Sequence, residues 1–108
     1  MRNKIEHQIQ SQIQEYLAYS GHKVWRNNVG CMRQGTRFIR FGVVGAGDLF
    51  SLKDGNFHSW EIKKPSGRTT ESQELWKQDI LDHGGNAYVV RSLDEVIEIL
   101  KNMMIRKL

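Results

Sequence analysis

The sequence predicts one mixed α/β domain over residues 1–108, with a central mixed sheet flanked by helices in the order αβββαβ. Three observations support this fold class. The N-terminal segment has helical periodicity, and two strand-like runs meet at Asp54-Gly55. A further strand-like run, 86–91, lies between two sequences typical of helix starts, Thr70–Gln73 and Ser92–Glu95. A chain of this length can bury one modest hydrophobic core.

The first helix is expected to begin after Asn3 as its cap and to end at about Tyr19, before Ser20-Gly21. Its apolar side chains fall in one stripe about 120° wide. These are Ile5, Ile9, Ile13, Tyr16 and Leu17. Glu6 lies inside this stripe, where a carboxylate is costly without a partner. We expect Glu6 to reach a functional site; the alternative is a solvated residue that interacts favourably with the helix dipole.

The next segment reads as a strand, a loop and a second strand. The strand is expected at His22–Arg26, the loop at Asn27–Gly35 and the second strand at Thr36–Val44. Gly45-Ala46-Gly47 then allows a close backbone approach just before Asp48, leaving space for a substrate strand or simply forming a bulge.

A hairpin turn at Asp54-Gly55 would bring Asp48 opposite Glu61. Counting outward from this turn makes them a non-hydrogen-bonded pair, with Cβ atoms roughly 4.5–5.5 Å apart. Lys63 would share their face because side chains alternate along a strand. A turn at Gly55-Asn56 would instead place Asp48 opposite Lys63 and assemble the same residues.

Two carboxylates at this spacing are typical ligands of a hard divalent cation such as Mg²⁺. A nearby lysine can then stabilise a phosphate or the water that attacks it. The alternative is a solvated surface ion pair. Phe50, Leu52 and Phe57 share the face, so something is expected to cover part of it. Like charges facing each other on a half-covered sheet are destabilising, which favours a metal site.

The second half is expected to contain two helices and a strand. Thr70–Gln73 forms a capping box that opens a helix through about His83, so Gln73 has a capping role and also lies where it can face the site. A strand follows at Asn86–Arg91. A last helix begins after Ser92. The tail from Lys101 to Leu108 is expected either to fray or to pack its apolar side chains against the domain or a second subunit.

Charge distribution favours a nucleic-acid partner over other partners. The net charge is +4, and no acidic residue occurs from Tyr16 to Gly47. A segment of one sign attracts phosphate and accelerates encounter with nucleic acid, although basic segments also merely aid solubility. The candidate nucleic-acid contacts are Arg26, Asn27, Arg33, Arg37, Arg40, Lys64 and Arg68.

Other features exclude several classes of protein. Cys31 is the only cysteine, so neither an internal disulfide nor a cysteine zinc site is expected. The four histidines have no metal-ligand spacing. No run is apolar enough to span a membrane and the N-terminus does not resemble a secretory signal, so the reducing cytoplasm is the expected compartment.

The motifs together resemble those of the PD-(D/E)xK nuclease superfamily, and specifically its virus-type replication–repair nuclease (VRR-NUC) domains. The resemblance rests on Gly47-Asp48-Leu49, Glu61-Ile62-Lys63 and Ser72-Gln73, and most strongly on the run Glu61–Arg68 followed by Gln73 and Trp76. It covers the chain from Glu6 to about Leu100. Gly47 is a departure, because the superfamily often has proline at this position.

This resemblance implies a restriction-endonuclease-like fold and assigns roles to the residues. Asp48, Glu61 and the Ile62 carbonyl would bind Mg²⁺ or Mn²⁺, and Glu6 would complete the acidic set, directly or through a water. Lys63 would orient the attacking water or stabilise charge on the phosphate. Gln73 would hold Lys63 or a substrate phosphate.

The implied activity is metal-dependent hydrolysis of DNA phosphodiesters, leaving a 5′-phosphate. Family members that stand alone resemble dimeric resolvases of four-way junctions or flap cutters, so a homodimer acting on branched DNA is expected. The main alternative is a non-catalytic DNA-binding module with the same fold. A small metal-dependent phosphatase and a structural interaction protein are further rivals.

Overall fold

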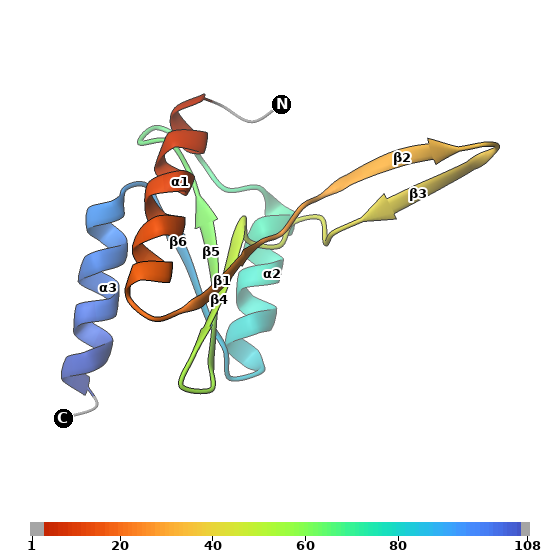
Figure 1. Ribbon diagram of the computed structural model, residues 1–108. Helices are drawn as coiled ribbons and strands as arrows, with labels where there is room; N and C mark the ends of the chain where they lie inside the picture. The colour runs from red at the N-terminus through yellow and green to blue at the C-terminus, as the bar shows by residue number, and fades with distance from the viewer. Residues whose placement is uncertain (1–3, 107–108) are drawn as a thin grey trace.

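Three helices and six strands make up residues 4–106, the part of the chain that the computed structural model describes (Figure 1). In chain order they are α1 (Lys4–Tyr19), β1 (Lys23–Arg26), β2 (Gly30–Gln34), β3 (Arg37–Phe41), β4 (Leu49–Lys53), β5 (Asn56–Ile62), α2 (Glu71–Asp82), β6 (Asn86–Val90) and α3 (Leu93–Arg106). The predicted cap Asn3 and the final two residues of the predicted tail lie outside the described range.

The central sheet is mixed and has the strand order β1-β4-β5-β6. β4 pairs antiparallel with both β1 and β5, whereas β5 and β6 are parallel and are joined through α2. Helices α1 and α3 lie on one face of the sheet and α2 lies on the other (Figure 1). The predicted fold class and the αβββαβ order are therefore confirmed, with β2 and β3 inserted after the first strand.

The main core lies between the sheet and helices α1 and α3. Its largest member is Trp60, which is fully buried and donates a hydrogen bond from Nε1 to Ser51 Oγ at 2.9 Å. Ile13 and Leu17 of α1 are also fully buried against it, and each such side chain contributes roughly 1.5–3 kcal/mol. The predicted stripe is wrong at Ile5, which is 51% exposed because it lies in the first turn, at the end of the helix.

The predicted hairpin between β4 and β5 is confirmed. Asp54 and Gly55 have φ of 53° and 80°, as a two-residue type I′ turn requires. Lys53 pairs with Asn56, and Phe50 pairs with Ser59. The alternative turn at Gly55-Asn56 is excluded by this register.

Aromatic side chains and α2 cover the second face of the sheet. The rings of Phe50 and Trp76 lie 6.0 Å apart between centroids, and those of Phe50 and Phe57 lie 5.5 Å apart. Trp76 also donates from Nε1 to Ser59 Oγ at 2.9 Å. This is the face that carries Glu61, so the expected partial cover exists and is supplied by α2.

The predicted loop at Asn27–Gly35 is wrong, and the following strand is shorter than predicted. Residues 30–34 form β2, which pairs antiparallel with β3 over 37–41. The two strands are joined by Gly35-Thr36, and Gly35 has φ of 65°. We call residues 30–41 the arm, because they project from the body of the molecule as a two-stranded ribbon (Figure 1).

The C-terminal half follows the prediction except at its end. Thr70 caps α2 in a capping box, and Ser92 Oγ accepts from the Glu95 N–H at 3.2 Å at the start of α3. The tail predicted to fray from Lys101 instead continues as helix to Arg106, although Met104 and Ile105 are 71% and 57% exposed. No helix among the described residues is long and apolar enough to cross a membrane.

Candidate active site

Asp48 lies at the break where the loop from the arm enters β4. The regular ladder ends at the Leu49–Trp60 pair, one pair short of the predicted Asp48–Glu61 pair. Asp48 instead donates from its N–H to the Trp60 carbonyl at 2.8 Å and accepts from the Ile62 N–H at Oδ2, also at 2.8 Å. It bonds to both neighbours of Glu61. The predicted regular Asp48–Glu61 pair is therefore absent, and Asp48 instead bonds to β5 on both sides of Glu61.

Gly47 allows the backbone to pass close to β5 at this point. A Cβ added here would lie 2.4 Å from Ser59 Oγ and 3.0 Å from the Trp60 nitrogen and oxygen. Those contacts are closer than a methyl group tolerates. The glycine that departs from the superfamily pattern is thus required by the packing of this chain, and it fixes the approach of Asp48.

Glu61 and Lys63 form a nearly buried ion pair at the end of β5. Lys63 Nζ lies 3.7 Å from Glu61 Oε1, and the two side chains are 13% and 10% exposed. The Lys63 N–H donates to the Val90 carbonyl at 2.9 Å, which anchors this end of β5 on β6. Burial strengthens this attraction relative to an exposed pair, because water screens it less.

Gln73 connects this pair to the start of α2. Its Nε2 donates to Glu61 Oε1 at 3.0 Å, while its Oε1 accepts from the Thr70 N–H at 2.9 Å. The side chain therefore caps the helix and orients a site carboxylate at the same time. Gln73 thus contacts Glu61, the ion-pair partner of Lys63, and its contact with Lys63 or a substrate phosphate stays a prediction.

Glu6 reaches the same end of the sheet from α1. Its Oε2 accepts from the Lys64 N–H at 3.3 Å, so the predicted partner exists and is a backbone donor. Residues 4–106 contain no group of three acidic, histidine or cysteine side chains arranged to hold a metal ion. In this structure the Glu6 carboxylate binds the chain just after Lys63, and its contact with a metal, directly or through a water, stays a prediction.

The donor chemistry of the remaining residues fits a hard divalent cation. Asp48 and Glu61 carry carboxylate oxygens, and Asp48 bonds to the residues on both sides of Glu61, including the N–H of Ile62. Lys63 and Gln73 already hold one oxygen of Glu61. The Ile62 carbonyl remains a predicted ligand.

The predicted nucleic-acid contacts are divided between the arm and the site edge. Arg33, Arg37 and Arg40 lie on the arm, and Arg26 is at the end of β1. Asn27 has a structural role at the base of the arm: its side-chain amide donates to and accepts from the Val43 backbone at 3.0 and 3.3 Å. Contact of any of these residues with a phosphate stays a prediction.

Lys64 and Arg68 lie in the loop between β5 and α2, beside Glu61 and Lys63 in the chain. Arg91, which the sequence reading missed, fixes this loop by donating from Nη2 to the Gly67 carbonyl at 2.9 Å. Its position in the sequence could have indicated this role, because Arg91 directly follows β6, and β6 is the parallel neighbour of β5.

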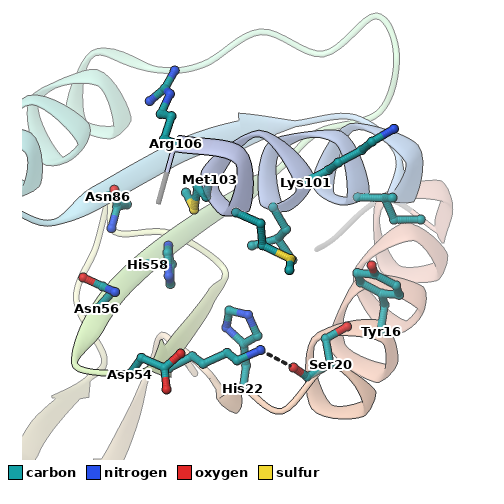
Figure 2. Close-up of a pocket in the computed structure, with 14 residues that line it drawn as sticks. Tyr16, Ser20, His22, Asp54, Asn56, His58, Asn86, Lys101, Met103 and Arg106 are labelled. Carbon is teal, nitrogen blue, oxygen red and sulfur yellow. Dashed lines mark hydrogen bonds between the residues drawn. The ribbon is translucent and has the colours of Figure 1, made fainter. Parts of the chain in front are cut away.

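A cavity of about 890 Å³ lies at the other end of the sheet (Figure 2). It is lined by the tip of the β4–β5 hairpin, the end of α1 and the C-terminal half of α3. His22 and His58 point into it, and Lys53 donates to the Ser20 carbonyl at its rim at 2.8 Å. None of the predicted site residues lines this cavity, so it is separate from the carboxylates.

Comparison with known proteins gives a match in fold. The chain superposes on a solved structure titled "VRR_NUC domain" with a TM-score of 0.68 and 21% sequence identity, covering 92% of this chain and 97% of that chain. No family sequence model matches. No curated protein matches in sequence. The chain therefore has the fold of that VRR-NUC domain.

Proposed function

We propose that this chain is an Mg²⁺- or Mn²⁺-dependent DNA endonuclease that hydrolyses phosphodiester bonds. The observation that carries the proposal is the convergence of Asp48, Glu61 and Lys63 at one end of the sheet, with Gln73 bound to Glu61 at 3.0 Å. Two carboxylates, a lysine and an orienting amide are the groups that metal-assisted phosphoryl transfer to water requires. The VRR-NUC fold supports the same assignment.

Each residue has a role that follows from its contacts. Asp48 and Glu61 would hold the cation, and Gln73 fixes the orientation of Glu61. Lys63, whose backbone N–H donates to the Val90 carbonyl, would orient the attacking water and stabilise negative charge on the phosphate. When bound, the metal would supply Lewis-acid polarisation of the phosphate and would lower the pKa of the water.

The reaction forms one bond and breaks another. The oxygen of water bonds to phosphorus in line with the leaving 3′ oxygen, and the P–O3′ bond breaks. The water loses one proton to solvent and the leaving oxygen gains one. The products are a 3′-hydroxyl and a 5′-phosphate.

A two-fold homodimer acting on branched DNA completes the proposal. The chain carries one candidate site, and cutting two strands of a junction requires two. The basic arm and the absence of acidic residues from Tyr16 to Gly47 support a nucleic-acid substrate over a free nucleotide.

The test is a panel of linear, nicked, flapped and four-way DNA substrates, with Mg²⁺, with Mn²⁺ and with chelator. Cleavage should need the metal and should fall at least about 100-fold in Asp48→Asn and in Lys63→Ala. Asp82→Asn and Lys101→Ala, which remove the same groups from exposed positions, should cleave normally. Sedimentation of the same samples tests the dimer.

The rivals make different predictions in this panel. Tight metal-independent binding without cleavage of any substrate would identify the non-catalytic module. Turnover of free nucleotides with little dependence of DNA binding on salt would identify a phosphatase. Stability that is unaffected by metal, together with no activity on either substrate class, would leave only a structural protein.

A further inference from the structure

The arm extends from the body without packing against it (Figure 1). Among residues 4–106, β2 and β3 contact each other, and no other helix or strand packs on either of their faces. Every residue from Cys31 to Phe38 is exposed, including the large side chains of Met32 (52%) and Phe38 (65%).

A two-stranded ribbon of this kind is marginal by itself. Isolated hairpins need a further packed layer to be stable in water, and none of the described elements supplies one. The arm also exposes the large apolar side chains of Met32 and Phe38, which is typical of a surface that binds a partner. The arm therefore presents exposed faces on which a partner outside the described residues can bind.

Charge identifies the chemical class of that partner. The arm carries Arg33, Arg37 and Arg40 and no acidic residue, within a segment free of acids from 16 to 47. Arg33 also lies over the Phe38 ring at 5.0 Å, so a cation and an aromatic surface are presented together. A second copy of this chain, with a net charge of +4, is a poorer match than a polyanion.

We propose that the arm enters the major groove of duplex DNA beside the cleavage site. The groove is about 12 Å wide and accepts a two-stranded β-ribbon. Five-residue strands rising about 3.3 Å per residue span roughly 17 Å, which corresponds to about five base pairs. This inference rests on the proposed function, because the duplex is the substrate of the proposed nuclease.

The base of the arm links this contact to the active site. The Asn27 amide forms two hydrogen bonds with the Val43 backbone, and the Asn27 N–H donates to the Asp48 carbonyl at 3.0 Å. The segments entering and leaving the arm approach each other closely at Gly42, where an added Cβ would lie 2.4 Å from the Asn28 carbonyl oxygen. A duplex held by the arm is thereby held at a fixed distance from Asp48.

The sole cysteine gives a direct probe of arm contact. Cys31 is exposed and lies on the same face of β2 as Arg33, because side chains two residues apart in a strand point the same way. In Lys63→Ala protein, duplex DNA at about ten times Kd should slow alkylation of Cys31 by iodoacetamide about tenfold, because about nine-tenths of the protein is bound. A single-stranded DNA of equal length should protect less at equal occupancy, since it has no groove.

A charge variant tests the role of the arginines. In Arg33→Gln/Arg37→Gln/Arg40→Gln, the slope of log affinity against log salt should fall in magnitude by two to three, about one for each lost phosphate contact. The matched control, Lys23→Gln/Lys101→Gln/Arg106→Gln, removes the same charge from exposed positions away from the arm and should keep the slope.

The outcomes separate this inference from the proposed function. Equal slopes in the two triple variants, or unprotected Cys31 at saturating duplex, would overturn it even if wild-type protein cleaves DNA. Cys31 protection that appears with protein concentration and without DNA would assign the arm to a second copy and would also overturn it. Protection and a lowered slope in a protein that never cleaves DNA would sustain the arm contact and reject the nuclease.

Discussion

Gln73 is the residue in which folding and the candidate chemistry meet most directly. One end of its amide completes the capping box with Thr70, and the other end donates to Glu61. The helix start is therefore part of the support of the site. A side chain that is satisfied at both ends has one orientation, and this fixes the carboxylate that it contacts.

Removing only the donor of Gln73 should separate these two roles. In Gln73→Glu the carboxylate still accepts from the Thr70 N–H, so the helix cap is kept, and repulsion by Glu61 should lower the free energy of unfolding by only about 1 kcal/mol. The variant adds a third carboxylate beside those of Asp48 and Glu61. Metal-dependent cleavage should fall about 10–100-fold, the usual cost of losing an outer partner of a metal ligand. Thermal unfolding and cleavage of one DNA substrate measure the two effects.

Thr70→Ala is the matched control for this prediction. It removes the hydroxyl that accepts from the Gln73 N–H at 3.2 Å but keeps the backbone bond from Thr70 to Gln73 Oε1. Stability should fall by about 1 kcal/mol while cleavage stays unchanged. If Gln73→Glu cleaves as well as the wild type, the bond to Glu61 has no role in activity.

At the scale of elements, the β4–β5 hairpin and the loop before it set the position of Asp48. The turn fixes the register, and Gly47 lets the loop approach β5. Because Asp48 bonds to both sides of Glu61, any shift of the loop moves one carboxylate relative to the other.

Gly47→Ala should therefore reduce activity beyond its effect on stability. Its Cβ would lie 2.4 Å from Ser59 Oγ, and relief of this overlap should cost about 1–3 kcal/mol of folding free energy. Displacement of Asp48 by about 1 Å should lower cleavage about 100-fold.

The comparison variant is Gly84→Ala, at the end of α2. Gly84 has φ of 87° and no atom within 4 Å of an added Cβ, so the change costs about 1–2 kcal/mol of backbone strain without steric overlap. Cleavage by folded Gly84→Ala should be normal. An equal loss of activity in both variants would mean that lowered stability alone explains Gly47→Ala.

Elements with a local signal could be predicted from the sequence. The Asp54-Gly55 turn is predictable because both of its residues adopt positive φ, and the strand register as far as Leu49–Trp60 follows from it by counting. The start of α2 is predictable from the four residues 70–73, because Thr70 and Gln73 form a capping box. The position of Glu6 was also predictable, because its carboxylate interrupts an otherwise apolar stripe.

Elements and contacts that depend on tertiary context could not be predicted. The β2 strand lacks apolar alternation because neither of its faces is buried, so the periodicity that reveals strands is absent. The direction of the Gln73 donor depends on where α2 packs, and short-range patterns do not contain that information.

At the scale of the whole molecule, the two ends of the sheet have separate chemistry. The carboxylates lie where β5 ends, and the cavity with His22 and His58 lies at the hairpin tip (Figure 2). His22 is 8% exposed, and no hydrogen-bond partner for its Nδ1 is found among the described residues. Burial, with the charge of Lys53 as a smaller cause, lowers the pKa of His22 below its ordinary value of 6.5.

This lowered pKa predicts a loss of stability on acidification. The unfolded chain protonates His22 at about pH 6.5, whereas the folded chain resists protonation to a lower pH, so the unfolded state binds more protons between the two values. The free energy of unfolding should then be at its full value above pH 6.5 and should fall as the pH drops toward 5. His22→Phe, which keeps a ring against His58 without a titrating group, should flatten this part of the curve.

His83 provides a control of opposite sign for the same measurement. It is fully exposed, and its bond to the Asp79 carbonyl, together with the Asp79 carboxylate, raises the pKa of His83 above 6.5. Its contribution is present below pH 6.5 and is lost as the pH rises through the raised value. His83→Gln should therefore leave the acid side of the curve as steep as in the wild type. Denaturant unfolding from pH 5 to 8 measures all three proteins, and a wild-type slope in His22→Phe would assign the acid sensitivity to other groups.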